Sequence, residues 1–218
     1  MSSGPFYSQS KEDQILYEKF FKNYKQEGQK YFFEMGAIDG VLFNNTKFFE
    51  DSLGWKGLLV EGNPFVFPRL LLNRPKSLCV NAVVSNLQTP INFRVCLNIP
   101  AVCSVASTQP KSFDDEYYKR SQMFDYNAIP TTLTTIVKNS ALPRIDLAVL
   151  DVEGHEIHVL DSFDFENSIP IVSWMIETFD TLDDNNEIVK YMKAKNYKCM
   201  GNVAHNAFFV REDFVKLF

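Results

Sequence analysis

Several features that mark familiar classes of protein are missing from this sequence of 218 residues. It has no block of Lys or Arg and a formal net charge of −5, so it lacks the basic footprint of a protein that binds nucleic acid or an anionic membrane surface. No apolar run approaches the roughly 20 residues of a membrane span, and the first residues lack the apolar region of a signal peptide. We therefore expect a soluble, cytoplasmic protein with no nucleic-acid and no membrane partner.

Cysteine pairs are missing as well. Cys79, Cys96, Cys103 and Cys199 include no C-x-x-C spacing, which argues against a zinc site, and we expect buried free thiols in a reducing compartment. No internal repeat is visible. With 45% hydrophobic residues, the chain can bury a substantial core, and we expect one domain over residues 1–218.

The G-x-G-x-x-G fingerprint of dinucleotide-binding proteins is the most informative absence. In its place, Gly36 and Gly40 form a G-x-x-x-G turn after a predicted strand, 31–33, that Glu34 closes. The three glycines of the fingerprint serve a pyrophosphate, whereas S-adenosylmethionine has no phosphate. A second predicted strand ends in Glu61, 25 positions beyond Gly36, near where a doubly wound fold binds ribose hydroxyls with an acid. The pattern favours S-adenosylmethionine over NAD.

Predicted helices and strands alternate along the rest of the chain, which is typical of an α/β fold with a doubly wound, mostly parallel sheet. Two apolar runs have the length of buried strands: 145–150, which ends in Asp151, and 171–176, which ends in Glu177. Residues 86–143 have a looser pattern, and we expect a variable insertion there on the substrate side. The other predicted elements are a leading helix at 12–27 within residues 1–29, helices at 44–53, from Pro64, at 155–162 and at 187–195, strands at 57–60 and 77–84, and a C-terminal antiparallel hairpin at 197–211.

Several sequence blocks, in this order, are shared with one family. They are Ser8-Gln9 with Glu12-Asp13, the run 33–40 (FEMGAIDG), Asn45-Thr46, the run 55–61 (WKGLLVE), Asp146-Leu147 with the run 150–156 (LDVEGHE), and the run 206–211 (NAFFVR). Through them the chain resembles the FkbM-type S-adenosylmethionine-dependent methyltransferases. The resemblance implies a seven-stranded class I methyltransferase fold and O-methylation of a hydroxyl, with macrolides and sugars as the better-known acceptors. The segment 111–126 matches no part of the family pattern, so the acceptor does not transfer with the resemblance.

The residues expected to hold the methyl donor follow from these blocks. Glu34 and Asp39 would either face the ammonium of the donor or shape the loop around it, and Glu61 would bind the ribose. The full set is Glu34, Gly36, Ala37, Asp39 and Gly40 around the amino acid tail, Glu61 on the ribose, Asn81 and Ala82 near the adenine, Gln9 and Asn45 closing over the site, and Asp151 beside them.

The acceptor hydroxyl must lose a proton, so a side-chain base or a metal ion is needed. Asp151 and Glu177 end neighbouring predicted strands, on the edge where ligands of open α/β sheets bind. With Glu153 or Asp180 nearby, they would suit Mg²⁺, which prefers oxygen ligands. Alternatively, Asp151 caps the turn at Gly154, and Glu177 orders a loop or contacts the substrate.

Candidates for the base are few, because the sequence has three histidines. His155 stands beside Asp151 and Glu153 and titrates near neutrality. His205, in the terminal hairpin, competes with it, whereas His158 is interpreted as a packing or solvent residue. The carboxylates of Asp151 and Glu153 are the other candidates.

These patterns predict an S-adenosylmethionine-dependent O-methyltransferase that acts on a small-molecule or glycan acceptor, most simply a sugar or glycan precursor. One alternative is an NAD-dependent oxidoreductase on a similar fold, for which Tyr191 and Lys195 have the right spacing but stand on a late surface helix. The other alternative is a catalytically inactive cofactor-binding module.

Overall fold

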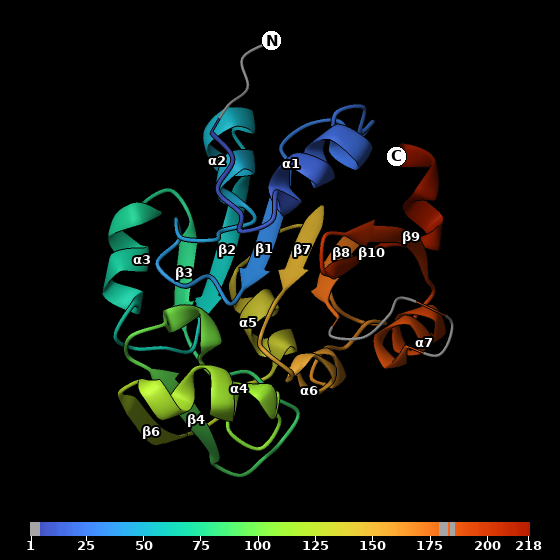
Figure 1. Cartoon of the computed structure of the whole chain (residues 1–218). Coiled ribbons are helices and arrows are strands. Elements are labelled where there is room, and N and C mark those ends of the chain that lie inside the picture. Colours follow the sequence, from blue (N-terminus) through green and yellow to red (C-terminus); the bar gives the residue numbers. More distant parts are fainter. Residues whose placement is uncertain (1–4, 179–182, 184–185) are drawn as a thin grey trace.

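The computed structural model describes residues 5–178, 183 and 186–218. Seven strands form one sheet in the order β3-β2-β1-β7-β8-β10-β9 (Figure 1), in which β10 pairs antiparallel with β8 and β9 and the other neighbouring pairs are parallel. The predicted fold class and its C-terminal hairpin are confirmed. The strands are β1 (Tyr31–Met35), β2 (Lys56–Glu61), β3 (Leu78–Asn81), β7 (Leu147–Leu150), β8 (Ser173–Glu177), β9 (Tyr197–Val203) and β10 (Asn206–Arg211).

The central strands are buried on both faces, which explains why they read as continuous apolar runs rather than as alternating patterns. Successive side chains point to opposite faces, so that Phe33 and Leu150 join one hydrophobic core while Phe32 and Val149 join the other. The helices that accompany this sheet are α1 (Glu12–Leu16), α2 (Lys47–Leu53), α3 (Phe67–Asn73), α5 (Leu133–Asn139), α6 (Glu156–Asp161) and α7 (Glu187–Ala194), with a 3-10 helix at Glu212–Leu217.

The leading helix is shorter than predicted. After α1 the chain makes a π-helical turn over Tyr17–Phe21 and then leaves the helix, so the prediction for 22–27 is wrong. Tyr24 explains the departure, because its hydroxyl donates a hydrogen bond of 2.8 Å to the buried Asp146 and its ring packs against Trp55. Tertiary contacts therefore override a helical pattern that is weak by itself.

A second, three-stranded antiparallel sheet is inserted between β3 and α5. It consists of β4 (Ile91–Cys96), β5 (Ser104–Val105) and β6 (Met123–Ala128), in the order β5-β4-β6. A short helix, α4 (Ser112–Glu116), and 3-10 helices at Pro100–Val102 and Tyr118–Arg120 accompany it. We call these three strands the inserted sheet. In Figure 1 the parallel strands of the main sheet point towards it.

Three further expectations about element boundaries are wrong. The helix expected from Pro64 begins at Phe67, with Pro68 in its first turn, where a proline is tolerated. The third strand ends at Asn81. The insertion was expected to cover residues 86–143, but α5 packs in the main core through Leu133, Ile136 and Val137. The inserted segment is therefore shorter than expected and ends before α5.

Two other expectations can be compared with the described residues. All four cysteines are free, but only Cys96 is fully buried, and the other three are half-buried. Among the described helices, none combines the length and apolar character needed to cross a membrane.

Candidate active site

A pocket opens at the carboxyl ends of β1, β2, β3 and β7. We call it the edge pocket. Its walls come from the loops that follow these strands, from the N-terminal segment and from the inserted sheet. The residues that line it are Gln9, Met35, Gly36, Ile38, Phe43, Asn45, Glu61, Gly62, Ala82, Val83, Val84, Phe93, Pro100, Ala101, Cys103, Val105, Asp151, Val152, Glu153 and His155.

Gly36 lets the loop after β1 approach the loop after β7. It has φ +87°, and a Cβ there would lie 2.0 Å from the carbonyl oxygen of Asp151, a separation that no side chain permits. Its N–H donates to the Val60 carbonyl at 3.1 Å. Glycine is therefore required where the two loops meet at the floor of the edge pocket.

Beneath the glycine turn lies a buried ionic network that we call the Arg74 cluster. Glu34 is inside β1 rather than at its end, and it accepts hydrogen bonds from the Asn45 N–H at 2.8 Å and the Thr46 hydroxyl at 2.6 Å. Arg74, 1% exposed, is paired with Glu50 and also donates to Asn44 Oδ1 at 2.8 Å. Of the two roles considered for Glu34, the geometry favours shaping the loop.

Glu61, the last residue of β2, is 5% exposed and faces the edge pocket. Its two carboxylate oxygens accept backbone N–H bonds of 2.7 Å each, from Ile38 and from Asn63. Burial raises its pKa to about 7, although these bonds oppose the shift. These backbone bonds hold the carboxylate in place, so Glu61 is a rigid hydrogen-bond acceptor that faces the edge pocket.

Asn45 gives an independent indication of a ligand. Its side-chain oxygen is buried and has no hydrogen-bond partner among the described residues, although the residue lines the edge pocket. A buried acceptor without a donor costs about 1–3 kcal/mol, which a ligand N–H or O–H would recover. Among the described lining residues, none is Lys or Arg. This acceptor-rich, anionic lining fits S-adenosylmethionine, whose ammonium, ribose hydroxyls and adenine amine are donors and whose sulfur is positively charged.

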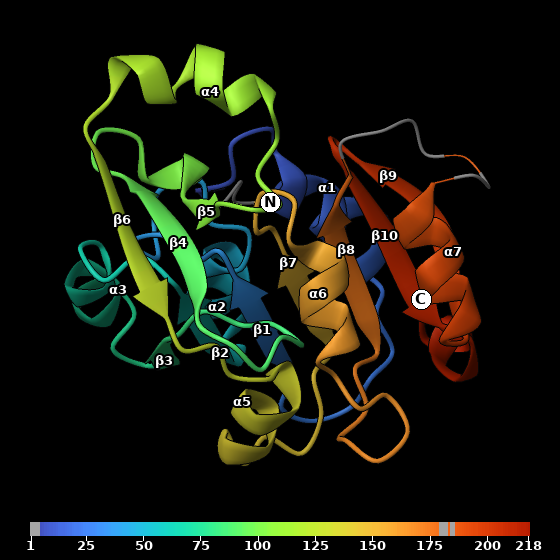
Figure 2. The same ribbon diagram turned by 90° about the horizontal axis from the view of Figure 1, so that it is seen from below.

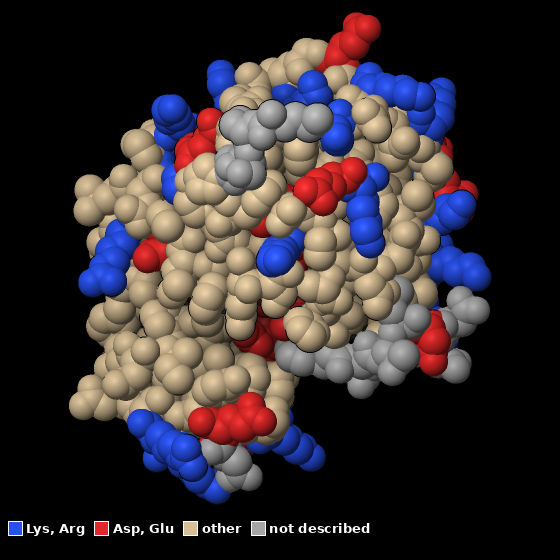
Figure 3. Space-filling model, turned by 45° about the horizontal axis from the view of Figure 1, so that its top comes forward, with Lys and Arg blue, Asp and Glu red and all other residues tan. Residues whose placement is uncertain are grey.

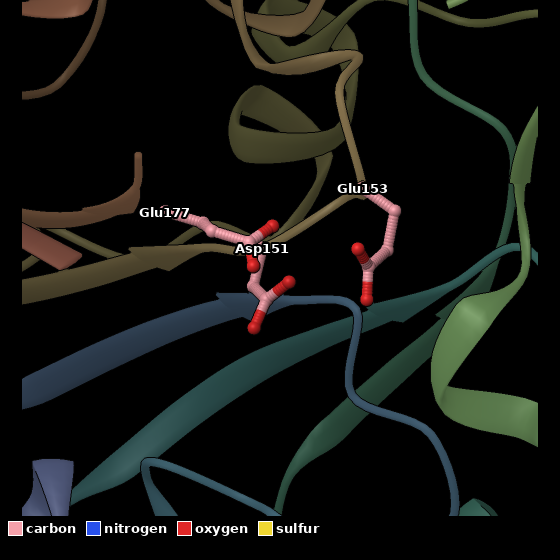
Figure 4. A group of neighbouring side chains, drawn as sticks. All are labelled: Asp151, Glu153 and Glu177. Carbon is pink, nitrogen blue, oxygen red and sulfur yellow. The ribbon is translucent and has the colours of Figure 1, made fainter. Parts of the chain in front are cut away.

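Three carboxylates meet at the other end of the edge pocket, and we call them the acid cluster. Asp151, Glu153 and Glu177 each offer an oxygen such that all three lie within 4.8 Å of one another. Figure 4 shows Asp151 and Glu177 side by side, with Glu153 facing them from the loop after β7. Figure 3 shows acidic side chains in the hollow between the lobe of the inserted sheet and the body of the molecule.

The acid cluster is electrostatically strained. Burial raises the pKa of all three carboxyls, and the charge of Asp151 raises those of Glu153 and Glu177 further. Asp151 and Glu177 lie side by side, so a proton on either carboxyl would relieve the repulsion between them. Glu153 also has a left-handed backbone with φ +56°, uncommon for a residue other than glycine. Perturbed carboxyls in a cleft are candidates for catalysis.

His155 has both ring nitrogens engaged. Nδ1 lies 3.0 Å from the Thr108 hydroxyl and Nε2 lies 3.1 Å from the Ser85 hydroxyl, and the residue is 2% exposed. Its ring stacks on His158 with centroids 4.5 Å apart. Burial, with a smaller effect from His158, lowers the pKa of His155 to about 4. The ring is therefore a neutral connector between two loops and has no free nitrogen for a substrate.

The structure brings together only some of the residues predicted for the site. Those that line the edge pocket are Gln9, Gly36, Asn45, Glu61, Ala82, Asp151, Glu153 and His155. Those that do not line it are Glu34, Ala37, Asp39, Gly40, Asn81, Glu177 and His205.

The residues outside the lining have other contacts. Asp39 accepts from the N–H groups of Val41 and Leu42, and Asn81 donates to the Glu61 carbonyl at 2.7 Å. His205 is exposed at the hairpin turn, where its carbonyl accepts from Thr178. Asp180 lies outside the described residues.

Sequence reasoning missed the apolar wall that the inserted sheet contributes, formed chiefly by Phe93, Cys103 and Val105. The alternation of Ile91, Phe93 and Val95 indicates a strand, but not the surface that the strand covers. Only the tertiary placement of the inserted sheet shows that this face meets the edge pocket.

The strand order and a ligand pocket at the carboxyl edge define a class I methyltransferase fold. The chain belongs to the FkbM methyltransferase family, because the model of the Methyltransferase FkbM domain matches residues 34–199. The resemblance drawn from the motifs is thus confirmed, and membership implies S-adenosylmethionine as the methyl donor. Among curated proteins, none matches the chain.

A solved structure with some likeness is the precorrin-6y C5,15-methyltransferase from Geobacter metallireducens GS-15. It is 12% identical, the likeness covers 96% of this chain and 91% of that chain, and the TM-score is 0.39. At that level the likeness adds nothing to the strand order described above.

Proposed function

We propose that this protein is an S-adenosylmethionine-dependent O-methyltransferase that methylates a hydroxyl of a sugar or glycan precursor. The observation that carries the proposal is the edge pocket, in which a rigid acceptor, Glu61, and an unpartnered acceptor, Asn45, stand opposite the acid cluster. Family membership supports the methyl transfer. The hydroxyl acceptor and its sugar character are the proposed part.

The residues divide the work of the reaction between them. S-adenosylmethionine supplies a methyl group bound to a positively charged sulfur. Glu61 would orient the ribose, and Asn45 would accept a hydrogen bond from the donor. The acceptor hydroxyl gains the methyl group and gives up its proton, which the protein must receive. Alignment of the two reactants in the buried pocket supplies much of the remaining acceleration.

Glu153 is the base that the geometry favours. Burial and the charge of Asp151 raise its pKa to about 9, so it acts as a base only when ionised, a form that a bound cationic donor would favour. It lines the edge pocket, whereas Glu177 does not, and the carboxyl of Asp151 lies beside that of Glu177. His155 has no free ring nitrogen, and His205 stands outside the pocket. The strained backbone of Glu153 agrees with this role, because such strain persists where function requires it.

A Mg²⁺ ion bound by Asp151 and Glu177 is the alternative means of activating the hydroxyl. Three carboxylate oxygens within 4.8 Å are a suitable donor set for a hard cation. Addition of EDTA to an active assay, followed by restoration of Mg²⁺, separates the two. Full activity in the presence of EDTA would exclude a metal requirement and leave Glu153 as the proposed base.

The lining also restricts the acceptor. Because no Lys or Arg is among the described lining residues and three of them are acids, a phosphorylated or carboxylated acceptor would meet repulsion without a compensating cation. We therefore favour an uncharged polyol.

Calorimetric titration with S-adenosylmethionine, S-adenosylhomocysteine and NAD tests the donor. Binding of NAD with neither sulfur ligand would refute the proposal. A turnover assay over neutral sugars, sugar phosphates and small alcohols then tests the acceptor, and methylation of a neutral sugar hydroxyl is the expected result. Binding of the donor with no turnover over the whole panel would favour the inactive module.

A further inference from the structure

The inserted sheet lies in the segment 86–143, whose looser sequence pattern predicted a substrate-side insertion, but its contacts are with the ends of β2 and β3. Its inner face carries Phe93, Val95 and Val105, which form one small hydrophobic core with Val83 of the main domain. Val83 directly follows Ala82, and both line the edge pocket. The inserted sheet is therefore packed on the end of β3.

Contacts with the end of β2 are equally close. The Tyr126 hydroxyl of β6 donates to the Gly62 carbonyl at 2.7 Å, and a Cβ on Gly62 would lie 2.8 Å from the Phe93 ring. The Asn63 side chain donates to the Cys103 sulfur at 3.4 Å. Gly62 and Asn63 are the two residues that follow Glu61, so the inserted sheet is fixed directly beside the carboxylate proposed to bind ribose.

The wall made in this way differs chemically from the rest of the edge pocket. The inserted sheet and its 3-10 helix contribute Phe93, Pro100, Ala101, Cys103 and Val105. These side chains are apolar or, for Cys103, only weakly polar, whereas the opposite end holds the acid cluster. A flat, apolar and aromatic surface suits a nucleobase, because a base stacks well on an aromatic ring.

The views of the fold agree with this division. Figure 2 shows the inserted sheet and α4 over the half of the main sheet that contains β1, β2 and β3, with β8, β9 and β10 outside it. The loop after β5 also contacts the part of the pocket near the acid cluster, through a hydrogen bond between Thr108 and His155. The strands of the inserted sheet lie over the β2 and β3 side of the main sheet.

We infer that the inserted sheet is a wall of the nucleoside half of the donor pocket, with Phe93 as its stacking residue, and that the acceptor is selected elsewhere. The remaining boundary of the pocket, near Gln9, Phe43 and Glu153, is where the acceptor enters. This inference rests on the proposed function, since it places the adenosine of the donor beside Glu61 and Ala82.

Phe93→Leu and Phe113→Leu form a matched pair for the test. Both phenylalanines are 8% exposed, but Phe113 belongs to the core on the opposite face of the inserted sheet, with Cys96 and Tyr118. We would titrate each variant with S-adenosylhomocysteine and with 5′-methylthioadenosine, which lacks the amino acid tail. Phe93→Leu is expected to weaken both ligands by the same factor, about fivefold, which is what loss of an aromatic contact costs. Phe113→Leu should change neither.

Val105→Ala, on the same wall, should also weaken both ligands, and it keeps the test open if Phe93→Leu does not fold. Affinities within twofold of the wild type for both Phe93→Leu and Val105→Ala would overturn the inference. So would a loss confined to S-adenosylhomocysteine, because the wall would then face the tail. A wild-type protein that binds neither ligand would instead refute the proposed function, so the two failures are distinguishable.

Discussion

Two groups of acids in this protein, the Arg74 cluster and the acid cluster, differ in how their charge is balanced. In the Arg74 cluster, Glu50 is paired with Arg74, and Glu34 accepts from a backbone N–H and a hydroxyl. In the acid cluster, no Lys or Arg of the described residues forms an ion pair with Asp151, Glu153 or Glu177.

We interpret the difference as one between a structural network and a candidate reactive one. Burying a charge is costly unless a partner compensates it, so a compensated group serves the fold and an uncompensated one must have another reason to persist. The Arg74 cluster holds the glycine turn, because Arg74 also donates to the Gly40 carbonyl at 3.2 Å. The acid cluster faces the space where a cationic donor would sit.

The largest expected effect is on folding stability. Arg74→Met leaves Glu50 buried without its cation, and removal of one partner of a buried pair costs about 3–5 kcal/mol. Urea unfolding measures it. The control is Arg94→Met, which breaks the half-exposed pair with Asp125 and should cost no more than about 1 kcal/mol. Equal losses in the two variants would show that the Arg74 cluster does not stabilise the fold.

Removal of an acid from the acid cluster is expected to lower turnover and not stability. Burial and the charge of Asp151 raise the pKa of Glu153 to about 9, so Glu153→Gln should not lower stability near pH 7 and should raise it above pH 9, where the ionised form is costly. Turnover should fall on the order of 100-fold, because a positioned base contributes at least that much. Glu50→Gln, the same substitution in the Arg74 cluster, should lower stability more than turnover. If Glu153→Gln keeps wild-type kcat, Glu153 is not the base.

How much of the structure the sequence predicts depends on how far apart in sequence the interacting residues are. The lengths of the apolar runs predicted the central strands, because β7 and β8 are buried on both faces of the sheet. The network around Glu34 was beyond prediction, since Thr46, which donates to Glu34, also accepts from Arg74, and only the fold brings Arg74, 40 positions away in sequence, to that hydroxyl. The same holds for His155, whose ring is fixed by Ser85 and Thr108, and for Phe93, whose strand belongs to a separate sheet.

The smallest expected effect is on donor binding by Glu61. This buried acid resembles the Arg74 cluster in having hydrogen-bond partners, and it resembles the acid cluster in having a raised pKa and no ion pair with a Lys or Arg of the described residues. Its oxygens are held by backbone N–H groups, yet burial raises its pKa to about 7. Below that pH the carboxyl binds a proton, and the neutral acid is a weaker acceptor for the ribose hydroxyls than the carboxylate. Affinity for the donor should therefore fall as the pH drops through 7, by up to about tenfold between pH 8 and pH 6, the limit for one titrating group with that pKa.

The uncharged ligand 5′-methylthioadenosine isolates this effect, because it carries no cation to interact with the acid cluster. Calorimetry at pH 8, 7 and 6 measures the dependence, and Glu61→Gln should bind more weakly at pH 8 and with no slope. A slope that persists in Glu61→Gln would assign the titration to another group. An affinity independent of pH in the wild type would mean that the ribose is held by the backbone around Glu61 and not by its carboxylate, which would place Glu61 with Glu34 among the acids that serve the fold.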